Sequence, residues 1–194
     1  TYFADTYLQT GIVAPDDVVG GSHCMTPRYL EDQIERSRKN LGLDTIDVYY
    51  VHNPETQLDE VSRAEFGSRI REARSALEEA VTAGKIGRYG TATWNGYRAP
   101  AKSQEFLSLE RVVATAREVA GENHHCKVVQ LPFNLAMTEA LTLGNQSVNG
   151  QAMSLLEAAE ELGVTVMASA SMLQARLASG LPETIAEVFP GLQT

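Results

Sequence analysis

The chain has 194 residues, 43% of them hydrophobic and 21% charged, which is ordinary for a soluble globular protein. Its 25 acidic and 16 basic residues give a net charge of -9, which disfavours nucleic acid or an anionic membrane surface as the main partner. Its two cysteines lie outside any C-x-x-C pattern, and this predicts a reduced, cytoplasmic protein.

The longest apolar runs lie near Val128 to Phe133 and Val164 to Ala170, and neither approaches the roughly 20 residues that span a bilayer. Thr1 to Asp5 contain an acid and no basic stretch ahead of an apolar core, so they do not form a secretory signal. Since the sequence does not begin with Met, we expect it to start within a longer protein. We expect residues 1–194 to form a single domain.

Turn-forming residues dominate the first 24 positions, where we expect a long loop with at most a short helix or strand. Amphipathic helical patterns and apolar runs alternate after that. The expected helices cover Thr26 to Leu41, Arg63 to Ala83, Leu107 to Val119 and Met153 to Leu162, and the expected strands cover Ile46 to His52, Ile86 to Thr93, Cys126 to Phe133 and Val164 to Ala170. A short helical turn is expected within Asn134 to Gly150, and another short helix over Pro182 to Val188.

Four helix–strand pairs in this order predict an α/β fold with a parallel sheet and right-handed crossovers. Nearly continuous apolar strands are typical of a sheet covered on both faces, or of the inner wall of a (β/α) barrel. A repeat of about 40 residues favours a partial (β/α)8 TIM barrel over a complete doubly wound domain. Because four strands alone leave two open edges, we expect either missing units or self-association through those edges.

The first expected strand ends in His52, Asn53 and Pro54, at the end where parallel α/β enzymes place their chemistry. A lone histidine at a strand end is more often a structural residue. Glu55 and Asp59 follow, and we expect them at a solvated loop edge.

Four segments combine helix ends, strands and polar strand exits in a recurring order. They are Ser37 to Pro54 with an "LGLD" turn and a His-x-Pro strand end, Ala76 to Gly90, Val128 to Asn134 with a "Q-x-x-x-N" strand end, and Leu155 to Ala168. In order and spacing they resemble the aldo-keto reductase family. The resemblance implies that the expected strands correspond to units 4 to 7 of that family's barrel.

The resemblance implies an NADPH-dependent oxidoreductase that reduces a small-molecule carbonyl to an alcohol, using a histidine, a tyrosine, a lysine and an aspartate. Only the histidine, His52, has a counterpart here, as a hydrogen-bond donor to the substrate oxygen. Asp5 and Tyr7 are too close together to match the aspartate and tyrosine. The lysines occupy helices, loops or strand entrances. We therefore expect the segment alone to be inactive, because an unassisted tyrosine with a pKa of about 10 is a poor acid at neutral pH.

The resemblance also implies a cofactor site at the other strand ends. Gln130 is expected to bind the nicotinamide carboxamide through its donor and its acceptor. Further cofactor candidates are Thr93, Asn95, Ser169, Ser171 and Leu173, and the substrate-pocket candidates are Trp94 and Asn53. The family's Ser-Asn pair and its stacking aromatic residue are replaced here, and Trp94 fits either a pocket wall or simple packing.

Two other functions remain open from the sequence. One is a non-catalytic barrel of the same type that binds a nucleotide and another protein; the other is an unrelated TIM-barrel hydrolase or lyase that uses His52 with Glu55. No metal site is expected at His23-Cys24 or at His124-His125-Cys126, because adjacent residues of an extended chain point in opposite directions.

Overall fold

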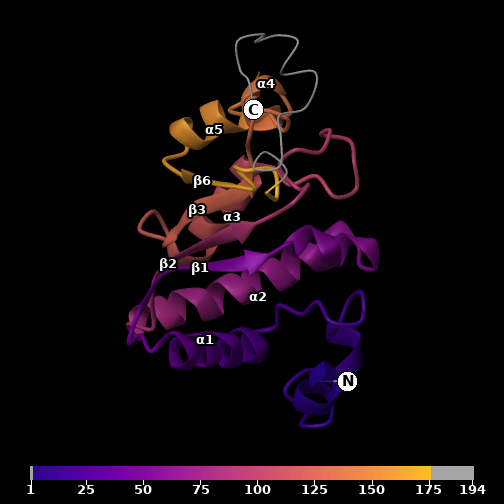
Figure 1. The fold of residues 1–194 in the computed structure, drawn as a ribbon, viewed down its shortest axis with the longest axis vertical. Helices are drawn as coiled ribbons and strands as arrows, with labels where there is room; N and C mark the ends of the chain where they lie inside the picture. Colours follow the sequence, from indigo (N-terminus) through magenta and orange to yellow (C-terminus); the bar gives the residue numbers. More distant parts are fainter. Residues whose placement is uncertain (1, 176–194) are drawn as a thin grey trace.

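A four-stranded parallel sheet forms the centre of the computed structural model, which describes residues 2–175 (Figure 1). The strands are β1 (Ile46–His52), β2 (Ile86–Ala92), β3 (Cys126–Pro132) and β6 (Thr165–Ser169), and their order in the sheet is β1-β2-β3-β6. Each of these strands pairs in parallel with the next one along the chain. Each right-handed crossover adds the next strand on the same side of the previous one. The helices between the strands therefore all lie on one face of the sheet, as in a barrel wall.

The main helices are α1 (Pro27–Leu41), α2 (Arg63–Thr82), α3 (Leu109–Ala120) and α5 (Leu155–Glu161). Three of them begin after a serine whose hydroxyl accepts a hydrogen bond from the backbone N–H three residues later: Ser62, Ser108 and Ser154. The chain leaves α1 through Gly42, which has a left-handed φ of 68°. The four predicted helix–strand pairs are confirmed.

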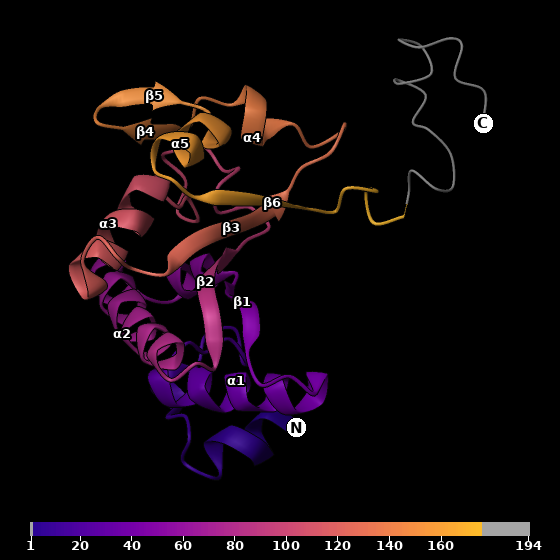
Figure 2. The ribbon, with the colours of Figure 1, turned by 90° about the vertical axis from the view of Figure 1, so that its left-hand side faces the viewer.

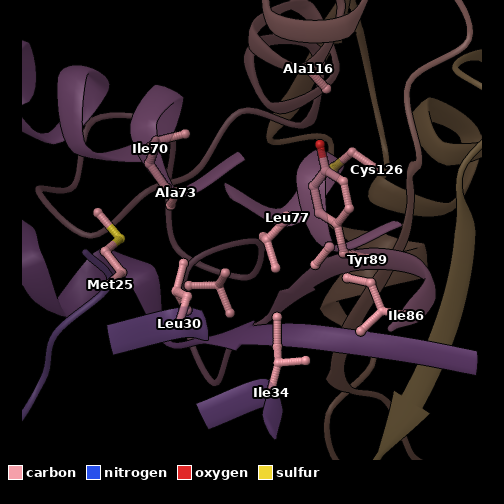
Figure 3. Close-up of a cluster of buried hydrophobic side chains, with 12 residues drawn as sticks. Met25, Leu30, Ile34, Ile70, Ala73, Leu77, Ile86, Tyr89, Ala116 and Cys126 are labelled. Atoms are coloured by element: carbon pink, nitrogen blue, oxygen red, sulfur yellow. The ribbon is translucent and has the colours of Figure 1, made fainter. Parts of the chain in front are cut away.

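Helices cover one face of the sheet, and two apolar cores lie between them and the strands. Leu30 and Ile34 of α1 and Leu77 of α2 pack with Ile86 and Tyr89 of β2 (Figure 3). A second core lies between α3, α5 and β3. These contacts fix the strands from the helix-covered face of the sheet.

The opposite face of the sheet has no helix over it among residues 2–175 (Figure 2). Met167 of β6 lies on this face and is 47% exposed. Of the two arrangements that the apolar strands predicted, the described part of the chain forms the barrel-wall arrangement. A sheet covered on both faces is not what the structure shows.

A β-hairpin precedes α5 in the chain, in a segment where the sequence predicted only a short helical turn. The predicted turn is α4 (Glu139–Thr142), and the hairpin consists of β4 (Gln146–Val148) and β5 (Gln151–Met153). Asn149 and Gly150 form its turn with φ values of 52° and 81°. The prediction that the fourth helix begins at Met153 is therefore wrong, since a capping box between Ser154 and Glu157 starts α5 at Leu155.

The first 24 residues contain short helices, as expected, in η1 (Ala4–Leu8) and η2 (Pro15–Asp17). They also bury Tyr7, Val13 and Cys24 against Tyr29 of α1. Pro182 to Val188, the last predicted helix, lies outside the described residues. No helix in the described part of the chain is both long enough and apolar enough to cross a bilayer.

Candidate functional site

One row of residues crosses the carboxyl end of the sheet. The strand register pairs His52 with Ala92, Ala92 with Gln130, and Gln130 with Met167. Neighbouring strands lie about 4.8 Å apart, so roughly 10 Å separates the His52 and Gln130 backbones. Both side chains share the uncovered face, and neither has a hydrogen-bond partner among residues 2–175. An imidazole and an amide are thus both available to a ligand above this face.

Asn53 joins the exits of β1 and β2. Its backbone is left-handed, with a φ of 44°, which asparagine tolerates better than most residues. Its N–H donates to the carbonyl of Ala92 at 2.6 Å, and its Oδ1 accepts from the backbone N–H of Trp94 at 3.0 Å. Asn53 therefore holds the Trp94 backbone next to His52.

A chain of hydrogen bonds that passes through the buried Gln57 supports the backbone of His52. His23 Nε2 donates to the carbonyl of His52 at 2.9 Å, Gln57 Nε2 donates to His23 Nδ1 at 2.8 Å, and Arg69 donates to Gln57 Oε1 at 2.6 Å. Burial lowers the pKa of His23 and favours the neutral ring that this pattern requires. His23 and Gln57 are supporting residues that the sequence analysis did not place at this site; it considered His23 only as a metal ligand and rejected it.

Glu55 lies in η3 (Pro54–Asp59) and is only 6% exposed. The expectation of a solvated loop edge is therefore wrong for Glu55, although Asp59 is exposed. Glu55 Oε1 accepts from the N–H of Gly96 at 3.3 Å, and Oε2 is buried without a partner. Burial raises the pKa of Glu55 to about 7. A Cβ at position 96 would lie 3.2 Å from Glu55 Cδ, so the close approach of this loop depends on glycine.

The candidates after β2 differ in their surroundings. Thr93 is 5% exposed, its N–H donates to the carbonyl of Gln130 at 2.9 Å, and its Oγ1 is buried without a partner. Trp94 is 41% exposed. Asn95 donates from Nδ2 to Glu105 at 3.2 Å. Thr93 thus lies beside Gln130, whereas the Asn95 side chain is already bound within its own loop.

The candidates after β6 line the next strand exit. Ser169 is half-buried, and its carbonyl accepts from the N–H of Phe133 at 3.1 Å. Ser171 is exposed, and Leu173 turns back through a bond from its N–H to the carbonyl of Ala170 at 2.7 Å. Ser169 is the last residue of β6, and Ser171 and Leu173 follow it, so all three lie on the Gln130 side of the row, three strands away from that of His52.

The lysines lie away from this row. Lys85 precedes β2 at its amino end and pairs with Glu35 at 2.8 Å, and Lys127 is the second residue of β3. Lys39 lies in α1, and Lys102 lies in the loop before α3. Among residues 2–175, no group of three or more His, Cys, Asp or Glu side chains is arranged to hold a metal ion.

The fold and the row define a class: a one-directional parallel α/β sheet of the (β/α)-barrel kind, with polar side chains at its carboxyl end. The model of the aldo/keto reductase family matches residues 13–180. The chain belongs to the aldo/keto reductase family. A search of curated proteins finds no match.

Solved structures of aldo-keto reductases share the fold. One from Klebsiella pneumoniae, in complex with NADP and acetate, has 22% identity and a TM-score of 0.50 over 83% of this chain and 46% of its own. The glycerol dehydrogenase of Gluconobacter oxydans has 20% identity and a TM-score of 0.52 over 81% and 36%. An enzyme from Bacillus halodurans has 15% identity and a TM-score of 0.50 over 82% and 41%. The chain spans less than half the length of each of these proteins.

Proposed function

We propose that the chain supplies units 4 to 7 of an NADPH-dependent carbonyl reductase, in which hydride transfer converts an aldehyde or ketone into an alcohol. The proposal rests on the row described above. His52 and Gln130 lie about two strand spacings apart on one uncovered face, and neither side chain has a hydrogen-bond partner in the part of the chain that the structure describes. Membership of the aldo/keto reductase family supports the same chemistry.

The residues beside Gln130 fit a nicotinamide. A carboxamide needs one acceptor and one donor, and the Gln130 amide offers both. The buried, unpaired Oγ1 of Thr93 adds a further polar group next to it. Ser169, Ser171 and Leu173 would form the adjoining wall, and Asn95 would add the amide groups that its bond to Glu105 does not use. NADPH, when bound, supplies the hydride.

His52 would orient the substrate. A neutral imidazole that donates to the carbonyl oxygen holds the carbonyl for attack and stabilises the negative charge that develops on it. Asn53 and His23 restrain the His52 backbone from two directions. The exposed ring of Trp94, whose backbone Asn53 holds, would form an apolar wall for the substrate.

The alcohol product also needs a proton. Lys39, Lys85 and Lys127 lie away from the carboxyl end of the described sheet, and Lys102, in the loop after β2, lines a cavity on the helix-covered side. No lysine of the described residues is therefore placed in the His52–Gln130 row, where it could lower the pKa of a tyrosine to the range of a general acid. We therefore propose that the proton donor comes from outside these 194 residues, and that the chain alone binds cofactor without turnover.

NADPH titration of the chain, followed by cofactor fluorescence, tests the cofactor site. Gln130→Ala is expected to weaken NADPH binding about tenfold, because it removes hydrogen bonds worth roughly 1 kcal/mol each. His52→Ala is expected to change the affinity less than twofold, since the imidazole faces the substrate. Gln151→Ala, in the exposed strand β5, is the matched control. Unchanged affinity of the Gln130 variant would remove this residue from the site.

Turnover tests His52 in any longer form of the protein that reduces an aromatic aldehyde. There His52→Ala is expected to lower kcat well beyond tenfold, and an unchanged rate would exclude the assigned role.

We further propose a cytoplasmic location and self-association through the outer edges of β1 and β6. Each of these strands has a single neighbour within residues 2–175, and Cys24 and Cys126 are unpaired thiols.

A further inference from the structure

A cavity of about 360 Å³ lies on the helix-covered side of the sheet, between α2, α3 and the loop before α3. α2 and α3 run side by side there (Figure 2). One side of the lining is apolar and comprises Phe66, Ile70, Phe106, Leu107 and Val112. The volume is within the range of roughly 300–1,000 Å³ that small-molecule sites occupy.

The charged residues of this cavity are all basic. Arg63, Arg74, Lys102 and Arg111 line it, and no Asp or Glu does. This is the opposite of the whole chain, whose net charge is -9. Arg63 is occupied, because its guanidinium donates to three carbonyls of the loop at 2.8–3.2 Å. Arg74, Lys102 and Arg111 have no ion pair within residues 2–175.

Arg74 is the unusual member of this set. It is 4% exposed, and its Nη1 is buried without a hydrogen-bond partner. The acid one helical turn further along α2 is Glu78, but Glu78 accepts from Tyr89 at 2.9 Å and from the His125 ring at 2.7 Å, and Glu72, two positions before Arg74, is exposed. A buried cation without a counter-ion is strongly unfavourable in a folded protein. An anion in the cavity would remove that cost.

The first turn of α3 does not itself provide the anion site. The N–H of Leu109 already donates to Gln146 at 2.9 Å, and the N–H of Arg111 donates to Ser108 at 3.3 Å. Attraction for a negative charge therefore comes from the side chains of Arg74, Arg111 and Lys102.

We propose that this cavity binds an amphipathic organic anion. Its carboxylate or phosphate head would pair with Arg74, with Arg111 and Lys102 at the mouth, and its apolar body would lie against Phe66 and Val112. The site is on the opposite side of the sheet from the His52–Gln130 row and does not depend on the function proposed for that row.

Isothermal titration of the chain with hexanoate, hexyl phosphate and hexanol tests the site. At least one anion is expected to bind, with hexanol at least tenfold weaker because it lacks the charge. Preference for hexanoate or for hexyl phosphate identifies a carboxylate or a phosphate ester as the natural head group. Saturating NADPH is expected to leave this binding unchanged. Absence of binding by both anions, equal binding of hexanol, or displacement by NADPH would each overturn the proposal.

Variants locate the binding. Arg74→Met keeps an unbranched apolar stem that can pack in the cavity and removes the charge, and it is expected to weaken anion binding at least tenfold. Arg71→Gln is the control on the same helix, since Arg71 is exposed and pairs with Glu118. If Arg74→Met fails to fold, Arg111→Gln at the exposed mouth of the cavity replaces it as the test, and it is expected to weaken anion binding about threefold. If the folded Arg74 variant binds the anion with wild-type affinity, the proposed site is refuted. The same holds for Arg111→Gln where that variant replaces it.

Discussion

Glu55→Gln is expected to stabilise the chain above pH 7 and to have little effect near pH 4. The glutamine keeps an oxygen that can accept from Gly96 N–H, but it carries no charge at any pH. The wild-type carboxylate is 6% exposed and has one buried oxygen without a partner, so its ionised form is disfavoured in the folded state.

The sign and size of the effect follow from the raised pKa. The folded chain keeps the Glu55 proton up to about pH 7, whereas an unperturbed carboxyl loses it near 4.5. Between these values the folded state binds more protons than the unfolded state, so stability falls as the pH rises and is level above pH 7. At about 1.4 kcal/mol for each pH unit, the loss that Glu55→Gln avoids is roughly 3 kcal/mol.

Urea unfolding at pH 4.5, 6 and 8 measures this difference directly, provided that the m values of the two proteins agree. Glu118→Gln serves as the control, because Glu118 is an exposed carboxylate that pairs with Arg71 at the surface. The gap between Glu55→Gln and wild type should open from near zero at pH 4.5 to its full size at pH 8. A constant gap, or a variant less stable than wild type at pH 8, would refute the assignment of a raised pKa.

Two further stability predictions concern neighbouring contacts. Glu78→Gln should show the opposite pH dependence. Burial alone would raise the pKa of Glu78, but hydrogen bonds from His125 and Tyr89 lower the pKa overall. The ionised Glu78 carboxylate therefore stabilises the fold at neutral pH. In urea unfolding at pH 7 we expect the variant to lose about 1.5–3 kcal/mol of stability, and this loss should disappear as the pH falls through the lowered pKa. A loss of the same size at every pH would contradict the prediction. Gly96→Ala should cost about 1–3 kcal/mol in the same assay, because its Cβ would lie 2.8 Å from Leu107 Cδ1, and a neutral effect would show that the loop can move away.

Helix and strand positions were determined mainly by local sequence. The observed ends of the main helices and strands lie within two residues of those predicted. Serine caps such as Ser62 and stop signals such as Gly42 act on backbone groups within one helical turn, so the nearby sequence contains the whole interaction. The β4–β5 hairpin also has a local signal in Asn149-Gly150, but its strands are too short for an alternating pattern to be recognised.

The candidate site was predictable only in part. That His52 and Gln130 lie at strand ends follows from the sequence, and the register then shows that they share one row and one face. That Asn95 bonds within its own loop could not be predicted, because the bond depends on where the folded loop places Glu105.

Tertiary structure alone decided which polar groups are buried and what they contact. His23 reaches the carbonyl of His52 across 29 positions, and Glu55 reaches Gly96 across 41. Arg74 occupies a helix position that resembles any exposed arginine in sequence, yet α3 and the loop before it close over it. Local patterns depend on spacing along the chain, whereas burial, pKa and the absence of a counter-ion depend on which distant segments pack together. For this protein the sequence determined the order of the barrel units and the strand-end histidine, and only the folded chain determined the support behind His52 and the basic cavity.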